Sequence, residues 1–474
     1  MKKDMISNKW IPPVLLILLI AVIVGLYSCG EDEAESATTL SSSSELIRPN
    51  DTLCLAINEI SLIEVPDPLS PDNTIYQLVD MDEPQVGVLF KDYHFNLDLV
   101  RVTQRGKIRH EYSRFDPFNK DQTMILLRNI DSGDYRVCRT DSMPYEQNHV
   151  RTITNLEEPR WDSHNPNLLW GISCFSIIML DTQSGTETVI KDFSTDAVIG
   201  PIIAADSDLY RVTMRDEGES SYDKRYWAFA LQGTDDDYKI DHIFTWDRAQ
   251  DTVLGVYHVP FNEREIDWLG MSYFGNYVLI GGDSSNGGNL AGLTMANREL
   301  TRFHRLDYTT AHSDVGLDTH GNEIIVMQNV RTDYVDLIPI DWNTQPILES
   351  GGSYEGTNRT PLLILYYVTG ANGLSTAGIH ISCNYPGYCV ISTYIEADDE
   401  ETNWMDRTNI LVKLDQTDPR AFYLSKLYST YQNYWEETHA TISNDGSKVI
   451  WASNWGKNVG ADELFLIQLV MPMY

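Results

Sequence analysis

Two histidines recur at the same position of a repeated unit near the end of the chain. His380 stands seven residues before Gly387, and His439 stands seven residues before Gly446. Each glycine belongs to a turn that leads into a hydrophobic run. Imidazole is a common ligand of divalent metal ions. Histidines at equivalent positions could therefore share one ion if the fold brings successive units together.

The preceding unit and one cysteine extend this set. Asp314 takes the same position in that unit, with His312 two residues earlier, and Cys383 follows His380 closely. Imidazole, carboxylate and thiolate are ligands of Zn²⁺, and imidazole also suits Mn²⁺. The predicted metal ligands are therefore His312, Asp314, His380, Cys383 and His439. Two alternatives stay open: the histidines hydrogen bond only to backbone, or Cys383 and Cys389 form a disulfide around their tight turn.

A second group of reactive side chains lies in a basic stretch. Residues 101–114 contain five cations and a histidine against one carboxylate, within a chain of net charge -34. His110, Tyr112 and Arg114 are spaced two apart, so on an extended strand they would share one face and Arg109 would face away. These are groups that move protons and stabilise negative charge. The alternative is a structural strand whose side chains cover a sheet edge.

Positioning these residues requires a repeated β-structure. Runs of three to six β-forming residues recur along the chain, each after a turn, whereas helical periodicity is scarce. The spacing is that of four-stranded blades. It predicts an all-β fold, a seven-bladed β-propeller of four-stranded antiparallel blades, with residues 53–103 supplying a closing strand. Two β-sandwiches are the alternative. The expected units begin near residues 108, 156, 215, 265, 311, 377 and 437.

The start of the chain has the pattern of an export signal. Lys2 and Lys3 precede an apolar run, and residues 26–29 read Leu-Tyr-Ser-Cys, which resembles a bacterial lipobox. We therefore predict a signal peptide at 1–28 and lipidation of Cys29. An uncleaved membrane anchor is the alternative, but Pro12 and Pro13 leave too short a run for the roughly 20 residues of a spanning helix.

The following residues predict a surface location. Residues 29–47 are acidic and rich in serine, which indicates a disordered linker before a single domain at 48–474. An acidic run at this place resembles the surface-export signal of Bacteroidota lipoproteins. We expect an outer-membrane lipoprotein at the cell surface, in contact with the membrane only through the Cys29 lipid.

Charge and cysteine content limit the partners and the redox state. A net charge of -34 argues against nucleic acid, because an acidic surface repels phosphate. Five cysteines remain beyond Cys29. The number is odd, so at least one thiol is not in an intramolecular disulfide.

Several short motifs resemble those of known propellers. The blade pattern resembles the Ser-x-Asp-Gly repeat of Tol-type propellers over nearly the whole mature chain. A narrower set is similar to the seven-bladed polysaccharide lyases, of the oligogalacturonate lyase and ulvan lyase type. Its motifs are Arg109-His-Glu-Tyr-Ser-Arg, Pro159-Arg-Trp-Asp, Arg225-Tyr-Trp-Ala-Phe, His312-Ser-Asp-Val-Gly-Leu-Asp, His380-Ile-Ser and His439-Ala-Thr-Ile-Ser-Asn-Asp-Gly.

The resemblance implies β-elimination on an anionic, uronic-acid-containing polysaccharide or oligosaccharide. The oligogalacturonate lyase type also implies a divalent ion near the channel, held by histidines of neighbouring blades, whereas the ulvan lyase type leaves a purely structural role of the metal as the alternative. In such a reaction His110 and Tyr112 would transfer protons, and Arg114 would neutralise the substrate carboxylate. The predicted substrate-binding residues are Arg160, Arg225, Tyr226 and Trp435. The competing prediction is a propeller without catalysis that binds glycans or proteins.

Overall fold

The computed structural model describes residues 56–474 except 235–239, 330, 348–357, 366–377 and 398. The described residues belong to one compact unit, Leu46–Tyr474. The predicted signal peptide, the lipidation site Cys29 and the linker lie outside the described residues. None of the helices described is both long and apolar enough to cross a membrane.

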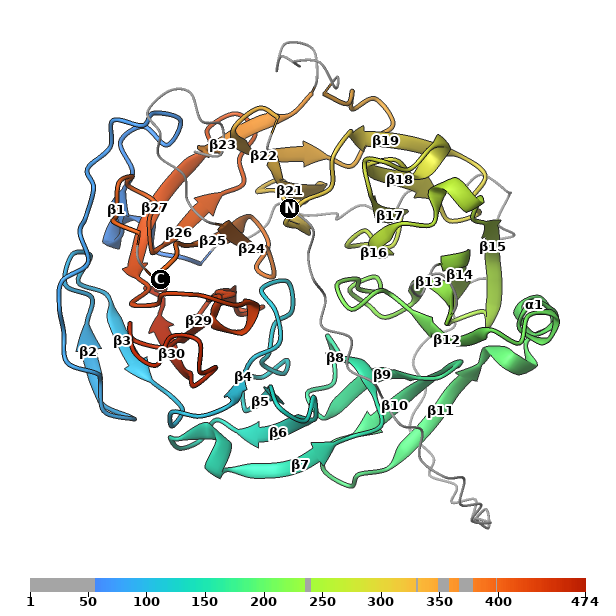
Figure 1. Ribbon diagram of the computed structural model, residues 1–474, viewed down its shortest axis with the longest axis horizontal. Helices are drawn as coiled ribbons and strands as arrows, with labels where there is room; N and C mark the ends of the chain where they lie inside the picture. The colour runs from blue at the N-terminus through green and yellow to red at the C-terminus, as the bar shows by residue number, and fades with distance from the viewer. Residues whose placement is uncertain (1–55, 235–239, 330, 348–357, 366–377, 398) are drawn as a thin grey trace, which may run out of the picture. The chain divides into compact units, whose positions relative to one another are not determined.

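Seven antiparallel sheets surround a central axis, so the predicted seven-bladed propeller is confirmed (Figure 1). Sheet one contains β4 (Ile108–Arg109), β5 (Met124–Asn129), β6 (Tyr135–Arg139) and β7 (His149–Ile153). Sheet two contains β8 (Glu157–Trp161), β9 (Leu168–Ser173), β10 (Ser176–Asp181) and β11 (Glu187–Asp192). Sheet three contains β12 (Leu209–Thr213), β13 (Tyr226–Gly233), β14 (Ile240–Asp247) and β15 (Thr252–His258). The first strand of each sheet is the innermost.

The later sheets follow the same order. Sheets four and five contain β16 (Ile266–Met271), β17 (Tyr277–Gly282), β18 (Leu293–Asn297) and β19 (Phe303–Asp307), then β20 (Ser313–Leu317), β21 (Glu323–Asn329), β22 (Tyr334–Pro339) and β23 (Thr360–Ile364). Sheet six contains β24 (Gly378–Ser382), β25 (Tyr388–Tyr394), β26 (Thr408–Lys413), β27 (Arg420–Lys426) and β1 (Ile63–Glu64). Sheet seven contains β28 (Thr441–Ile442), β29 (Lys448–Ser453), β30 (Phe465–Val470), β3 (Asp98–Arg101) and β2 (Leu89–Lys91).

Helical structure is confined to short segments in the described part of the chain. These are α1 (Ile199–Ala205) and the 3-10 turns η1 (Glu59–Ser61), η2 (Tyr145–Gln147), η3 (Phe193–Thr195), η4 (Phe261–Glu263), η5 (Gly288–Leu290) and η6 (Tyr434–Glu436). The first strands of the sheets begin close to the predicted unit starts. Gly387 and Gly446 have φ of 84° and 72°, a left-handed conformation that explains a glycine in each of these turns.

The two ends of the described chain close the ring. Strand β3 pairs antiparallel with β30, with Leu99 opposite Leu469 and Arg101 opposite Ile467. Strand β1 likewise adds to β27 of the sixth sheet. The expectation that residues 53–103 supply a closing strand is therefore confirmed, and Figure 1 shows this early segment beside the last sheets.

The core consists of apolar side chains packed between adjacent sheets. One cluster joins Leu99 of β3 and Trp451 of β29 to Val390 and Leu411 of the sixth sheet, and all four are buried. Such face-to-face packing holds each blade to the next and sets the spacing of the inner strands.

The closing strand provides a direct test of this architecture. Leu99 is completely buried, so Leu99→Ala should lower the free energy of unfolding by about 2–5 kcal/mol through lost burial and a residual cavity. The measurement is the midpoint of denaturant unfolding. Leu89 on the neighbouring β2 is 62% exposed, so Leu89→Ala is the matched control and should change stability by less than about 0.5 kcal/mol. Equal unfolding midpoints for Leu99→Ala and Leu89→Ala would contradict the burial of Leu99 in the closing strand β3.

Candidate functional site

Three of the predicted histidines lie against one another near the centre of the ring. His312 directly precedes β20, His380 lies within β24, and His439 precedes β28 by two residues. The ring centroids of His312 and His380 are 4.7 Å apart, and those of His380 and His439 are 4.0 Å apart. Three consecutive blades thus deliver these imidazoles to one place, because all three lie in or directly before the innermost strands, which face the same axis.

A carboxylate that the sequence analysis missed completes the group. Glu437 Oε2 lies 2.9 Å from His380 Nε2 and 3.2 Å from His439 Nε2. One ligand atom from each of these three residues lies within 4.8 Å of the others. The feature of the sequence that could have pointed to Glu437 is its position two residues before His439. We call His312, His380, Glu437 and His439 the histidine cluster.

Tyr112 packs against all three imidazoles. Its hydroxyl lies 2.9 Å from His312 Nδ1, and its ring centroid lies 5.5 Å from that of His380 and 4.8 Å from that of His439. Burial raises the pKa of the Tyr112 phenol well above its ordinary value of 10.0. The side chain therefore remains a neutral phenol at physiological pH and fixes the His312 ring.

His110 contacts the backbone of the cluster. It is completely buried, and its Nε2 donates a hydrogen bond to the carbonyl oxygen of His439. Burial, followed by the charge of Arg109, lowers the pKa of His110 to about 3, so the imidazole is neutral. It is absent from the lining of the cavity described below. Through this hydrogen bond, His110 helps to hold the backbone of His439 in place.

The expectation that His110, Tyr112 and Arg114 share one face of a strand is wrong. Strand β4 ends at Arg109, and residues 110–114 form a loop that turns toward the axis. The period of two applies only to extended backbone, so the spacing of these residues does not place them on one face. Arg109, expected to face away, is buried and donates to the carbonyl oxygen of Trp435 at 2.5 Å.

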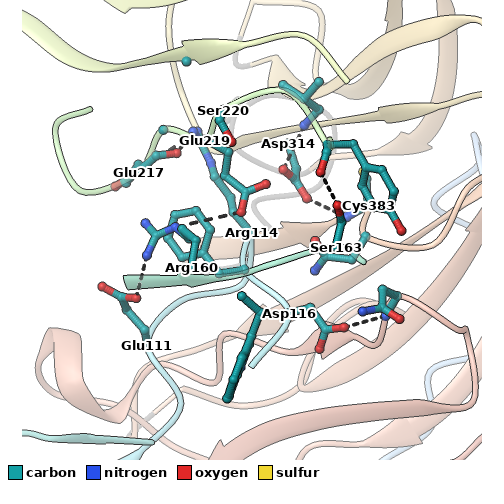
Figure 2. Close-up of a pocket in the computed structure, with 18 of the residues that line it drawn as sticks. Glu111, Arg114, Asp116, Arg160, Ser163, Glu217, Glu219, Ser220, Asp314 and Cys383 are labelled. Carbon is teal, nitrogen blue, oxygen red and sulfur yellow. Dashed lines mark hydrogen bonds and ion pairs between the residues drawn. The ribbon is translucent and has the colours of Figure 1, made fainter. Parts of the chain in front are cut away.

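Arg114 and Arg160 line a cavity of about 120 Å³ beside this loop (Figure 2). Arg114 donates to the carbonyl oxygen of Glu217 at 2.9 Å and to Ser313 Oγ at 3.1 Å, next to His312. Arg160 Nη1 lies 3.0 Å from Glu111 Oε2. Its guanidinium carbon lies 3.2 Å from the centre of the Phe115 ring. Arg114 Nη2 also lies 3.5 Å from Glu217 Oε2, and its guanidinium carbon lies 4.3 Å from the centre of the Trp268 ring. Each guanidinium group thus has a carboxylate and an aromatic ring of the protein as partners.

The cavity is not positively charged. Its charged lining comprises three cations, Arg114, Arg160 and Lys224, and six acidic residues, Glu111, Asp116, Asp162, Glu217, Glu219 and Asp314. Burial raises the pKa of Asp116 to about 7 and that of Asp314 to about 8, which reduces the negative charge without reversing it.

The rest of the basic stretch is paired as well. Arg101 and Arg105 both bind Glu83, at 2.5 and 2.7 Å, and Lys107 lies 3.4 Å from Asp131. Acidic side chains from outside residues 101–114 therefore neutralise these cations of the basic stretch.

Two of the predicted metal ligands have other partners. Cys383 forms a disulfide with Cys389, so it offers no thiolate to a metal ion. Asp314 accepts hydrogen bonds from the backbone N–H groups of Cys383 at 2.6 Å and Val315 at 2.8 Å, and it lines the cavity. Among the other described cysteines, Cys138 is buried and Cys174 is exposed, both as free thiols.

The predicted substrate-binding residues fall in three places. Arg160 lines the cavity, as described above. Arg225 forms a two-pronged ion pair with Asp247 at 3.1 and 2.9 Å, and Tyr226 is buried under Arg298, whose guanidinium lies 4.1 Å from its ring. Neither Arg225 nor Tyr226 lines the cavity.

Trp435 lies in η6 and does not line the cavity. Its ring packs 5.2 Å from that of Tyr434, and the Tyr434 ring lies 5.2 Å from that of His439. Tyr434 is 46% exposed. These two aromatic residues therefore form a solvent-accessible rim beside the buried imidazoles.

The fold is similar to solved structures of oligogalacturonate lyases. One, in complex with manganese, superposes with a TM-score of 0.53 at 9% identity, covering 82% of this chain and 97% of that one. Another, from Vibrio parahaemolyticus, has a TM-score of 0.52 at 10% identity, with 81% and 96% covered. Identity this low supports a shared fold alone. No protein-family model and no curated protein matches the chain.

Asp116 gives the site a testable pH dependence. Its carboxyl accepts from the backbone N–H groups of Asn444 at 2.7 Å and Phe118 at 2.9 Å, and burial raises its pKa from 3.8 to about 7. A raised pKa in the folded state adds stability that is complete below about pH 4 and is lost as pH rises through about 7. From about pH 5 to about pH 7, the wild type should therefore lose thermal stability relative to Asp116→Asn, and it should lose no more above that range.

The measurement is the unfolding temperature by circular dichroism at each pH. Asp181→Asn is the control, because hydrogen bonds from Ser184 lower the pKa of this exposed carboxyl and keep it ionised throughout that range. Parallel curves for the wild type and Asp116→Asn would contradict the assignment.

Proposed function

We propose that the protein is a metal-dependent lyase that cleaves uronic-acid-containing oligosaccharides or polysaccharides by β-elimination. The observation that carries the proposal is the meeting of His312, His380 and His439 from three blades with Glu437. The likeness to oligogalacturonate lyases, one of them in complex with manganese, adds support at the level of the fold.

The donor set fits a divalent metal ion. Two imidazole nitrogens and one carboxylate oxygen lie within 4.8 Å of each other, and the His312 ring adjoins that of His380. Zn²⁺ and Mn²⁺ both accept such ligands. Burial, followed by the neighbouring His380, lowers the pKa of His439 well below 6.5. The imidazole is thus neutral, which is the form that binds metal.

A metal ion at this site would explain how an acidic protein accepts an anionic substrate. An ion held by the histidine cluster would supply positive charge to balance the substrate carboxylate and the negative charge that develops during elimination. Arg114 and Arg160 already contact Glu217 and Glu111. We therefore prefer metal-assisted to arginine-assisted elimination.

The elimination needs no reactant other than the substrate. The proton on C5 of the uronic acid leaves, the bond from C4 to the glycosidic oxygen breaks, the C4–C5 double bond forms, and the leaving oxygen takes up a proton. Substrate would approach from the exposed rim, where Tyr434 and Trp435 offer aromatic faces for sugar rings. His110 binds the carbonyl oxygen of His439 through Nε2 and does not line the cavity, so we assign it to positioning His439 rather than to proton transfer.

A second candidate function is a glycan-binding propeller without catalysis. The observation that favours it is the cavity, where six acidic residues outnumber three cations. In both cases we propose an exported lipoprotein anchored to the outer membrane through Cys29.

A lyase assay decides between the two. The purified protein, stripped with a chelator and reloaded with Mn²⁺ or Zn²⁺, should raise ultraviolet absorbance on polygalacturonate or ulvan as the double bond forms. Glu437→Gln should reduce the rate by about 10- to 100-fold, because it replaces a charged ligand with a neutral one. His149→Ala, on the exposed face of β7, should keep the full rate. No absorbance change on either substrate would favour the non-catalytic alternative.

Tyr112→Phe tests how the cluster is oriented. A metal-bound His312 would use Nε2 as its ligand and donate Nδ1–H to the Tyr112 oxygen, which lies 2.9 Å away. Loss of such a partner typically weakens metal affinity by about 10- to 100-fold. Isothermal titration with Mn²⁺ or Zn²⁺ measures this. Tyr145→Phe, which removes a buried hydroxyl bound to Gln468, is the control and should leave the affinity unchanged. Equal affinities for the wild type and Tyr112→Phe would exclude this role.

A further inference from the structure

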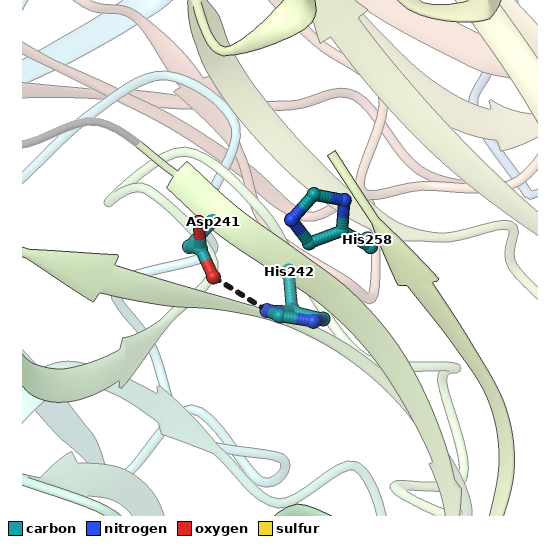
Figure 3. A group of neighbouring side chains, drawn as sticks. All are labelled: Asp241, His242 and His258. Carbon is teal, nitrogen blue, oxygen red and sulfur yellow. Dashed lines mark ion pairs between the residues drawn. The ribbon is translucent and has the colours of Figure 1, made fainter. Parts of the chain in front are cut away.

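A second group of metal-ligating side chains lies on the outer strands of the third sheet. Asp241 and His242 belong to β14, and His258 ends β15, the outermost strand of that sheet (Figure 3). One ligand atom from each of the three lies within 4.8 Å of the others. The group shares no residue with the histidine cluster, whose members lie at the inner strands of other sheets.

Strand register brings the two imidazoles together. His242 and His258 stand directly opposite each other in the antiparallel pair of β14 and β15, and their ring centroids are 4.9 Å apart. Side chains in directly opposed positions project from the same face of a sheet. This arrangement brings two imidazoles close enough for a nitrogen of each to bind the same ion.

A β-bulge adds the carboxylate. Along β13 the pairing passes from Leu231 opposite His242 to Gln232 opposite Ile240, so Asp241 is an extra residue in β14. In a regular strand Asp241 and His242 would point to opposite faces. The bulge re-aims the side chain, and Asp241 Oδ2 lies 2.7 Å from His242 Nδ1.

An arginine holds this carboxylate in place. Arg264 Nη2 donates to Asp241 Oδ1 at 2.6 Å, which leaves the other oxygen directed at His242. Carboxylates that ligate metal ions are commonly held by such an outer hydrogen bond. The side chains of His242 and Asp241 are 15% and 22% exposed, and His258 is exposed, so an ion can reach them from solvent.

We propose that Asp241, His242 and His258 bind one divalent transition-metal ion of the zinc class. Two imidazoles and one carboxylate are a donor set suited to Zn²⁺. Three protein ligands leave a coordination position for water or for a group from another molecule. The ion would bind where Asp241 Oδ2 now lies 2.7 Å from His242 Nδ1, and it would link the outermost strand β15 to β14. This site is independent of the proposed lyase function.

Zinc binding to the chelator-stripped protein, followed by titration calorimetry and metal analysis after dialysis, tests the site. We expect the wild type to bind one more Zn²⁺ per chain than His258→Ala. Asp241→Asn should weaken that binding step by about 10-fold or more, because it removes the charged ligand. His149→Ala removes an exposed histidine from β7, the outermost strand of the first sheet, and should bind as the wild type does.

The outcomes are distinct. Equal zinc content and affinity in the wild type and His258→Ala would overturn the site, whatever happens at the histidine cluster. Normal affinity in Asp241→Asn together with loss in His258→Ala would show an incidental histidine pair, and would overturn the three-ligand assignment. Unchanged thermal unfolding of the metal-free variants checks that the fold is intact.

Discussion

The pairing of β3 with β30 is the constraint on which the rest of the structure depends. It joins strands about 370 residues apart in the chain and completes the seventh sheet. That sheet carries His439, whereas His312 and His380 come from the fifth and sixth. The loop with Tyr112 follows β4 of the first sheet, which adjoins the seventh sheet in the ring. Without closure, the three imidazoles and the phenol would have no fixed separation, because each rests on a different blade.

Electrostatics at the centre of the ring follow from burial. Charges that lose water must find partners, and the arginines here do so, with Arg160 on Glu111 and Arg114 on Glu217. Imidazoles that lose water become neutral instead, as the lowered pKa values of His110 and His439 indicate. Neutral imidazoles beside Glu437 form a group with one negative charge at most and several nitrogen lone pairs. Such a group stabilises a cation better than an anion, which is why the proposed function relies on a metal ion.

Much of the fold could be predicted from the sequence, and less of the site. Turns followed by short β-runs recur at blade spacing, so the seven units and the closing segment followed from local pattern. The common position of His380 and His439 before their turn glycines suggested that they meet. Glu437 could not be found in this way, because it lies outside that position and the chain holds 69 acidic residues. The pairing of Arg160 with Glu111 also depends on contacts between blades, which no local pattern encodes.

His110 and His439 show why the role of a residue is harder to predict than its position. His380 lies within the ladder of β24, opposite Ser392, so its direction is set by strand pairing. His439 lies before β28, and its φ of 46° places it in the left-handed region, which is unfavourable for a residue with a Cβ atom. Its carbonyl oxygen accepts hydrogen bonds from His110 Nε2 and from Thr441 Oγ1. These bonds offset the cost of that conformation and turn the His439 side chain toward His380 and Glu437. A histidine whose type and spacing suggested a catalytic base thus supports the backbone of another histidine, and only the bend of the chain after Arg109 makes that contact possible.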